Sequence, residues 1–151
     1  MKKDRPSLTK VTNCLYRYTQ SYTDEALAKF QLSSGTYPFL LKLYHNEGIS
    51  QNQISKELNV DKAMSARSIK RLIELGYISK EENEEDNRAY RLFLTDKAKN
   101  IVPDIINEIN KWIDIITEDI SDIEKEQVIN FLEKILNNAK KHKHSKRDME
   151  E

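Results

Sequence analysis

The sequence has few of the residues that interrupt helices and few that form disulfides or metal sites. Three glycines and three prolines in 151 residues indicate few turns and much helix. A single cysteine, Cys14, excludes an intramolecular disulfide and a metal cluster of several thiolates. No run of about 18 apolar residues occurs, and no apolar segment follows the charged N-terminus, so we expect no membrane span and no signal peptide. These absences predict a cytoplasmic protein.

Motifs for catalysis and for metal binding are also lacking. The sequence contains no P-loop, no HExxH and no glycine-rich phosphate cradle, and no histidine pairs with a serine or cysteine in a recognisable motif. His142 and His144 could hold a metal weakly, but a frayed, solvated tail is the commoner outcome for such a segment. We therefore expect no enzyme activity, no cofactor and no metal.

The chain also lacks net charge, because 25 Lys and Arg residues balance 25 Asp and Glu residues. Global charge therefore does not indicate a nucleic-acid binder, and such a function would depend on where the cations are placed. The length suits one domain, or one small domain with a helical extension.

Helical periodicity is the dominant pattern. Apolar residues at three- and four-residue spacings predict a first helix over about residues 8–30. A second helix should begin after Ser33 or Thr36 as N-cap and end before Gly48, a residue that suits a left-handed conformation.

Two short helices follow and form a predicted helix-turn-helix. Ser50 and Gln53 have the spacing of a capping box, which starts the first of them. Asp61 is the predicted N-cap of the second, which runs over 62–75 and is closed by Gly76. An interval of about three residues between two helices is typical of a helix-turn-helix.

A β-hairpin is predicted next, with strands near 77–81 and over 89–94, and it makes this the winged form of the motif. Arg88, at the hairpin tip, could enter the DNA minor groove, where negative potential is greatest. Asp86 could accept a hydrogen bond from this guanidinium and fix its direction. The loop also holds glutamates, which should oppose indiscriminate phosphate binding or serve solubility alone. These are Glu81, Glu82, Glu84 and Glu85.

Two longer helices complete the chain. Thr95 is the predicted N-cap of the first, which contains Pro103 and should be bent or disturbed there. Ser121 and Glu124 form a capping box that starts the second. Their apolar stripes hold more isoleucine than one short antiparallel pair can cover, so a second copy of the chain is the economical partner. The stripes consist of Val102, Ile105, Ile109, Trp112, Ile113, Ile116 and Ile120, and then of Val128, Phe131, Leu132, Ile135 and Leu136.

The helix over 62–75 is the expected recognition helix, because the second helix of this motif lies in the major groove. Its inward face should consist of Ser65, Ser68, Ile69 and Leu72, and its outward face of Lys62, Ala63, Ala66, Arg67 and Lys70. Arg67 could bind guanine bidentately, and Ala63 or Ala66 could contact a thymine methyl group. Phosphates should be met by Lys62, Lys70 and Arg71. The alternative is an amphipathic helix whose basic face is only solvated.

Two segments of the chain resemble the MarR (multiple antibiotic resistance regulator) family. DNRAYRLFLT, which starts at Asp86, is similar to the family's wing motif, D-x-R followed by a strand ending in Leu-Thr. GISQNQISKELNVDKAMSARSIKRLIELGYI is similar to its helix-turn-helix. The similarity covers about residues 32–99, in the family's order and spacing, with compatible helices on both sides.

The resemblance implies a mostly α fold with a small β-hairpin, in which a winged helix-turn-helix domain is flanked by N- and C-terminal dimerisation helices. The winged part should lie at about 32–99, the dimerisation helices at about 8–30 and 96–141, and a flexible tail at 142–151. The implied function is a homodimeric transcription regulator, usually a repressor, that binds a pseudo-palindromic site in double-stranded DNA. Many members release DNA when a small aromatic or lipophilic effector binds.

By position in the family, Arg88 is the minor-groove arginine and Asp86 is its support. The outward residues of 62–70, with Met64 among them, become the major-groove readers. The family often has Ser or Thr where this chain has Ala63 and Met64, so the operator preference of relatives cannot be transferred.

Two residue groups suggest more specific functions. Cys14, with Tyr16, Tyr18 and Tyr37 in the sequence around it, is similar to the peroxide-sensing branch of the family, although a buried, inert cysteine is commoner. The same tyrosines and Trp112 could line an aromatic effector pocket, but core packing explains them as well.

A function of another class also remains open, namely a winged-helix protein-interaction module without DNA binding. Zero net charge and the glutamate loop favour it. The cations Arg67, Lys70 and Arg88 oppose it.

Overall fold

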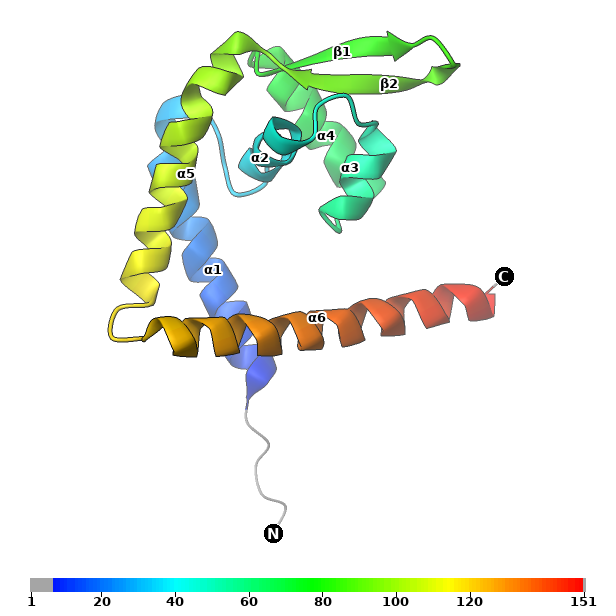
Figure 1. Cartoon of the computed structure of the whole chain (residues 1–151). Coiled ribbons are helices and arrows are strands. Elements are labelled where there is room, and N and C mark those ends of the chain that lie inside the picture. The colour runs from blue at the N-terminus through cyan, green and yellow to red at the C-terminus, as the bar shows by residue number, and fades with distance from the viewer. Residues whose placement is uncertain (1–6, 151) are drawn as a thin grey trace. The chain divides into compact units, whose positions relative to one another are not determined.

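The computed structural model describes residues 7–150, without the side chains of 86–89, 147, 148 and 150. The chain divides into two compact units, Met1–Trp112 and Ile113–Glu151, and each is considered by itself. The elements in chain order (Figure 1) are α1 (Leu8–Leu27), the 3-10 helix η1 (Ala28–Phe30), α2 (Tyr37–His45), α3 (Gln51–Glu57), α4 (Lys62–Glu74), β1 (Ile78–Asn83), β2 (Asp86–Leu94), α5 (Asp96–Ile116) and α6 (Asp122–Glu150). The structure thus confirms a mostly helical fold with one antiparallel hairpin. No helix among the described residues is long and apolar enough to cross a bilayer.

The caps predicted for the helix-turn-helix are present. The Ser50 hydroxyl accepts a hydrogen bond from the Gln53 backbone N–H at 3.2 Å, which starts α3. The Asp61 carboxylate accepts one from the Met64 N–H at 2.8 Å, which starts α4. Gly76 follows the end of α4 with φ of 77°, a left-handed conformation that glycine adopts without steric cost.

One buried cluster joins five elements of the first unit. It contains Phe39 of α2, Ile54 of α3, Leu72 of α4, Leu92 of β2 and Ile105 of α5, all essentially without exposed surface. Figure 1 shows α2, α3 and α4 gathered against the hairpin. Because each element contributes to the same core, the winged helix-turn-helix and the start of α5 form one packing unit.

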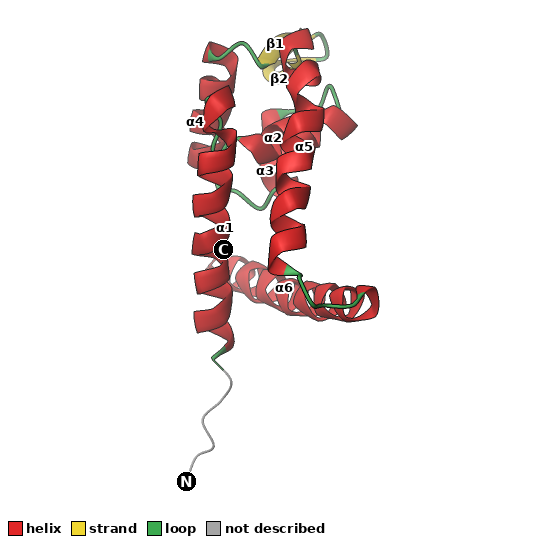
Figure 2. Ribbon diagram, turned by 90° about the vertical axis from the view of Figure 1, so that its left-hand side faces the viewer, coloured by secondary structure: helices red, strands yellow, loops and turns green. Residues whose placement is uncertain are grey.

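Helices α1 and α5 lie side by side in antiparallel directions (Figure 2). Near one end, Trp112 stacks on Tyr22 with ring centroids 4.7 Å apart and donates a hydrogen bond to the Thr19 hydroxyl at 3.0 Å. One turn closer to the start of α5, the Glu108 carboxylate lies 3.5 Å from the ammonium of Lys29, which belongs to η1. Ion pairs also lower the pKa of Glu108, first through a hydrogen bond from Lys111 and then through Lys29.

The hairpin strands are longer than predicted. Only Glu84 and Glu85 occupy the turn, whereas Glu81 and Glu82 belong to β1. Glu81 stands opposite Arg91 of β2, and opposite charges at directly paired positions stabilise a sheet. The prediction that these glutamates are loop residues was therefore wrong for Glu81 and Glu82.

The second unit contains the end of α5 and the whole of α6. The capping box is reciprocal, because the Ser121 N–H donates to the Glu124 carboxylate at 2.8 Å and the Glu124 N–H donates to the Ser121 hydroxyl at 3.3 Å. The first of these bonds lowers the pKa of Glu124, since it stabilises the charged carboxylate. Helix α6 then continues to Glu150, and residue 151 lies outside the described residues. The flexibility expected for residues 142–151 stays a prediction. No glycine or proline follows Ser121, and Lys, Ala and Glu are strong helix formers.

The apolar stripes predicted for the last two helices divide between the units. Val102 and Ile105 are buried, and Ile109 and Trp112 are partly buried. Pro103 lies inside α5, which continues from Asp96 to Ile116 without interruption. In the described part of the second unit no side chain is buried, so its stripe faces outward within the single chain.

Candidate nucleic-acid interface

Helix α4 has one buried face and one exposed face, as its sequence predicts. The buried face consists of Ser65, Ser68, Ile69 and Leu72. The exposed face consists of Lys62, Ala63, Ala66, Arg67 and Lys70, beside which Met64 is 37% exposed. Among the described side chains, none of the three cations on this face forms an ion pair, whereas Arg71 lies 4.0 Å from Glu74. The surface offered by α4 is therefore cationic with small apolar residues between the charges.

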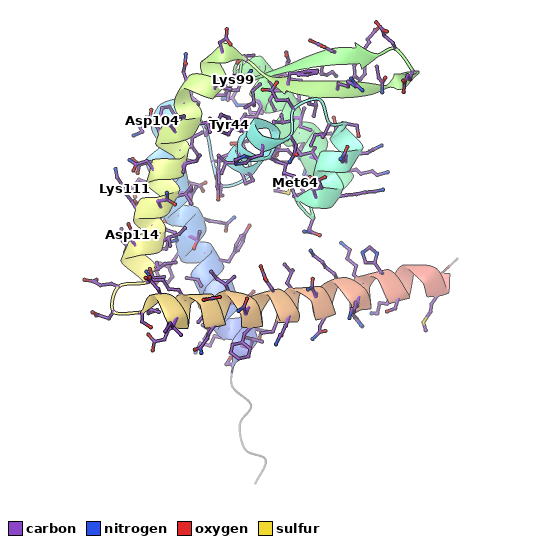
Figure 3. The ribbon with its side chains drawn as sticks, viewed as in Figure 1. Tyr44, Met64, Lys99, Asp104, Lys111 and Asp114 are labelled. Atoms are coloured by element: carbon purple, nitrogen blue, oxygen red, sulfur yellow. The ribbon has the colours of Figure 1, made fainter. Side chains whose placement is uncertain are left out.

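The start of α4 is held in place by a tight turn and by a long-range hydrogen bond. Asn59 adopts a left-handed conformation with φ of 54°, and the Val60 N–H donates to the Ser55 carbonyl at 3.0 Å. The buried Ser68 hydroxyl donates to the Gly35 carbonyl at 3.2 Å, which ties α4 to the segment before α2. Figure 3 shows Met64 where the turn from α3 enters α4. The first turns of α4 are thus rigidly placed for contact with a ligand.

We expect Asp61→Ala to lower the free energy of unfolding by about 1 kcal/mol, because the Met64 N–H loses its acceptor at the helix N-terminus. Urea denaturation followed by circular dichroism measures this change. Asp61→Asn retains an acceptor oxygen and is the matched control, which should stay close to the parent protein. Equal losses in the two variants would show that the cap is not the cause.

The end of α4 is held by residues at the start of α5 through contacts that the sequence did not predict. The Lys97 ammonium donates to the Leu75 carbonyl at 2.6 Å and lies 4.6 Å from the centre of the Tyr77 ring. The Thr95 hydroxyl donates to the Gly76 carbonyl at 2.6 Å and also accepts from the Ala98 N–H at 3.3 Å, as predicted for the N-cap of α5. The orientation of α4 is therefore coupled to α5. No local pattern indicates Lys97, because its partner is 22 residues away.

The hairpin is attached to the helix-turn-helix through the residues before α3. The Gly48 N–H donates to the Leu92 carbonyl at 2.8 Å, and the Leu92 N–H donates to the Ile49 carbonyl at 3.0 Å. Ser50 and Arg91 form an antiparallel bridge. These bonds add a short third segment to the base of the hairpin and keep its direction fixed relative to α3.

Helices α2 and α3 are joined by an ion pair beside the exposed surface. The Lys42 ammonium lies 2.7 Å from the Glu57 carboxylate, and the Gln53 amide donates to the same carboxylate at 3.3 Å. The pKa of Glu57 is lowered by these two hydrogen bonds, of which that from Lys42 has the larger effect. The Lys42 cation therefore offsets the negative charge of Glu57 and reduces its repulsion of an anionic ligand.

Asp86 and Arg88 belong to the first residues of β2, beyond the turn. Their side chains lie outside the described residues. The predicted hydrogen bond between them, and the minor-groove role of Arg88, stay predictions.

Cys14 is partly exposed on α1 and accepts a hydrogen bond from the Arg17 guanidinium at 3.3 Å. Tyr16 and Tyr18 are 62% and 70% exposed. Tyr37 is partly buried against the core, and this burial raises its pKa. The contact of the thiol is thus with an arginine, and a redox role for Cys14 stays a prediction.

The aromatic effector pocket also stays a prediction, since Trp112 pairs with Tyr22 rather than with the tyrosines expected to line it. An open hollow on the surface of α1 is lined by Cys14, Arg17, Tyr18 and Ser21. Within the described part of the chain, no group of three or more His, Cys, Asp or Glu residues is placed to hold a metal ion.

A rigid helix-turn-helix with an exposed cationic second helix and an attached hairpin defines a winged helix-turn-helix protein. Residues 32–90 match the model of the MarR family. The HTH-type transcriptional regulator BilQ from Clostridioides difficile (strain CD3) is 35% identical over 83% of this chain and 85% of that protein. The chain belongs to the MarR family of transcription regulators, and its relatives are regulators rather than enzymes.

Solved structures agree with this assignment. The MarR protein from Peptoclostridium difficile is 32% identical, with a TM-score of 0.88 over 94% of this chain and 93% of that one. The same fold occurs, at 23% identity and a TM-score of 0.84 over 89% of each chain, in a putative MarR family regulator from Listeria monocytogenes that was crystallised with 26mer DNA.

Proposed function

We propose that this protein is a homodimeric regulator that binds a pseudo-palindromic site in double-stranded DNA, represses transcription there in the cytoplasm and releases DNA in response to a signal. The exposed cationic face of α4 on a rigid helix-turn-helix is the observation that carries the proposal. The relative from Listeria, which shares the fold, was crystallised with DNA. A small aromatic or lipophilic effector is the expected signal, in keeping with the family.

The residues of α4 take two roles in this proposal. Arg67, in the second turn, is the proposed donor of two hydrogen bonds to a guanine edge, and Ala63 and Ala66 are small enough to let the helix approach the bases. Lys62 and Lys70 bind phosphates on either side and position the helix without reading sequence. Met64, exposed beside Ala63, offers an apolar contact where relatives often carry a hydroxyl.

Dimerisation is supported by the apolar surface that the single chain leaves exposed. Helix α6 carries an apolar stripe at three- and four-residue spacings, and each of its members is at least 41% exposed. These are Val128, Phe131, Leu132, Ile135 and Leu136. Such a surface in water favours association, and a two-fold axis covers the same patch on both copies.

The proposal is tested by fluorescence anisotropy with the DNA upstream of the protein's own gene. A regulator should prefer this DNA to unrelated duplexes and should lose affinity steeply as salt increases, because phosphate contacts release counterions. A protein-interaction module of the same fold should show no sequence preference at any salt concentration, and that result would remove the proposal.

Arg88→Ala should weaken binding to the preferred DNA by about 1–3 kcal/mol while leaving the free energy of unfolding unchanged, because the proposed role of this arginine is to bind DNA. Anisotropy titrations and urea denaturation measure the two quantities. Asp86→Ala should weaken binding less, and only in the chain that retains Arg88, since its role is to direct that side chain. Equal losses from Asp86→Ala with and without Arg88→Ala would exclude the supporting role of Asp86.

A further inference from the structure

The C-terminal part of α6 contains a dense run of cations, here called the basic segment, residues 134–147. It holds six Lys and Arg residues and two histidines, and it contains no acid. The rest of the chain is left with 19 cations against 25 acids, a formal net charge of −6. The neutrality of the whole protein therefore depends on the basic segment.

The apolar stripe of α6 ends where the cations become frequent. The positions that continue this stripe beyond Leu136 at helical spacings are Ala139, His142, Lys143 and Lys146. The side chains of residues 141–146 are exposed, and those of α6 stand out on both sides of the helix as far as its last turns (Figure 3). A partner that covers the apolar stripe would therefore gain no apolar contact from His142, Lys143 and Lys146.

Like charges in the basic segment lie close enough to repel one another. Lys140 and Lys143, and likewise Lys143 and Lys146, are three positions apart on the helix, a spacing that places side chains side by side. Among the described side chains, none of these lysines forms an ion pair with a carboxylate, in contrast to Lys125 near the start of α6, which lies 3.9 Å from Asp122. A ligand of high negative charge density would relieve this repulsion.

We propose that the basic segment is a second DNA contact, which binds backbone phosphates without regard to sequence. This inference rests on the proposed function, because it assigns the same duplex as partner. A duplex carries about one negative charge per 1.7 Å of its axis, and release of its counterions is what drives binding of clustered lysines. With the basic segment, a chain that is otherwise negative is attracted to DNA before α4 reaches the bases.

The composition of the segment favours DNA over a membrane surface as the partner. Helices that lie in a bilayer interface insert Trp, Phe or Leu between the lipids while their lysines meet the headgroups. The large apolar side chains of the basic segment, Ile135 and Leu136, belong to the apolar stripe, and residues 140–147 contain no Trp, Tyr, Phe, Leu, Ile, Val or Met. Residues 140–147 can therefore bind a charged surface, but they have no apolar side chain to insert into a bilayer.

The test compares two variants of the full chain with equal changes in charge. The first carries Lys140→Gln, Lys141→Gln, Lys143→Gln and Lys146→Gln. The matched control carries Lys10→Gln, Lys29→Gln, Lys111→Gln and Lys125→Gln, which lie outside the basic segment. Affinities for the preferred DNA and for an unrelated duplex are measured by anisotropy at several salt concentrations, and sedimentation verifies the oligomeric state of both variants.

The first variant should bind both duplexes more weakly by the same factor, about eightfold for each lost contact at 0.1 M salt. The slope of log affinity against log salt should become shallower by about 0.9 for each such contact, and the control should keep the parent slope. An unchanged slope, or the same change in the control, would overturn the inference. The inference would also be overturned if the first variant lost affinity for phosphatidylglycerol vesicles, measured in the same way, but kept its affinity for both duplexes.

These results separate the inference from the proposed function. If the parent protein prefers one DNA sequence but the lysine variant keeps its slope, only the inference fails. If the parent binds all duplexes equally and the lysine variant loses this binding, the inference stands and the proposed function fails.

Discussion

Replacing Phe131 and Ile135 of α6 by glutamate is expected to convert the protein into monomers and to lower its affinity for the preferred DNA by about 10²-fold or more. Both side chains are substantially exposed in the single chain, at 63% and 42%, and lie on the apolar stripe of α6. In a dimer the second recognition helix binds at high effective concentration once the first has bound, and a monomer loses this advantage. Sedimentation velocity and anisotropy titrations measure the two effects.

The matched control introduces the same two charges on the opposite side of α6. Asn130→Glu and Asn137→Glu lie about half a turn from the stripe, because a helix advances by about 100° per residue. This variant should remain dimeric, with a smaller loss of affinity caused only by the added negative charge. A Phe131 and Ile135 variant that still sediments as a dimer would show that another surface joins the copies.

Phe39→Ala is expected to lower the free energy of unfolding by about 3–5 kcal/mol. Phe39 is 1% exposed and belongs to the buried cluster that joins the helix-turn-helix, the hairpin and α5. Removing its ring leaves a cavity that rigid neighbours fill only in part, and the total stability of such a domain is only about 5–15 kcal/mol. Urea denaturation at fixed protein concentration measures the loss.

Tyr44→Ala on the same helix is the control for this substitution. Tyr44 is 44% exposed, and its position on α2 is shown in Figure 3. Its removal should cost much less, because surface substitutions away from special contacts usually change stability by about 0.5 kcal/mol or less. Similar losses for Phe39→Ala and Tyr44→Ala would mean that α2 contributes to stability through its helical propensity rather than through the core.

The elements of the helix-turn-helix were predictable because their signals are local. Asp61 caps α4 through a residue three positions away, and Gly76 closes it in a conformation that glycine favours. The faces of α4 were predictable for the same reason, since buried and exposed residues alternate with the period of the helix.

The length of the hairpin strands was not predictable from composition. Glutamate is uncommon in strands, so the sequence indicated an acidic loop directly after a first strand that ends near Glu81. Pairing of Glu82 with Tyr90 extends the ladder by contacts between two strands, and propensity within one strand does not contain that information. At the C-terminus the charges suggested fraying, whereas strong helix formers continue α6 to Glu150.

The order of the elements, the caps of the helices and the cationic face of α4 can be read from the amino-acid sequence alone, because each depends on residues a few positions apart. The contacts of Lys97 and Thr95 with the end of α4, and the pairing of residues 48–50 with β2, are visible only in the folded chain. Those bonds join residues about 20 to 40 positions apart, such as Lys97 with Leu75 and Gly48 with Leu92. They form only after the core has brought the elements together, and no local periodicity encodes them.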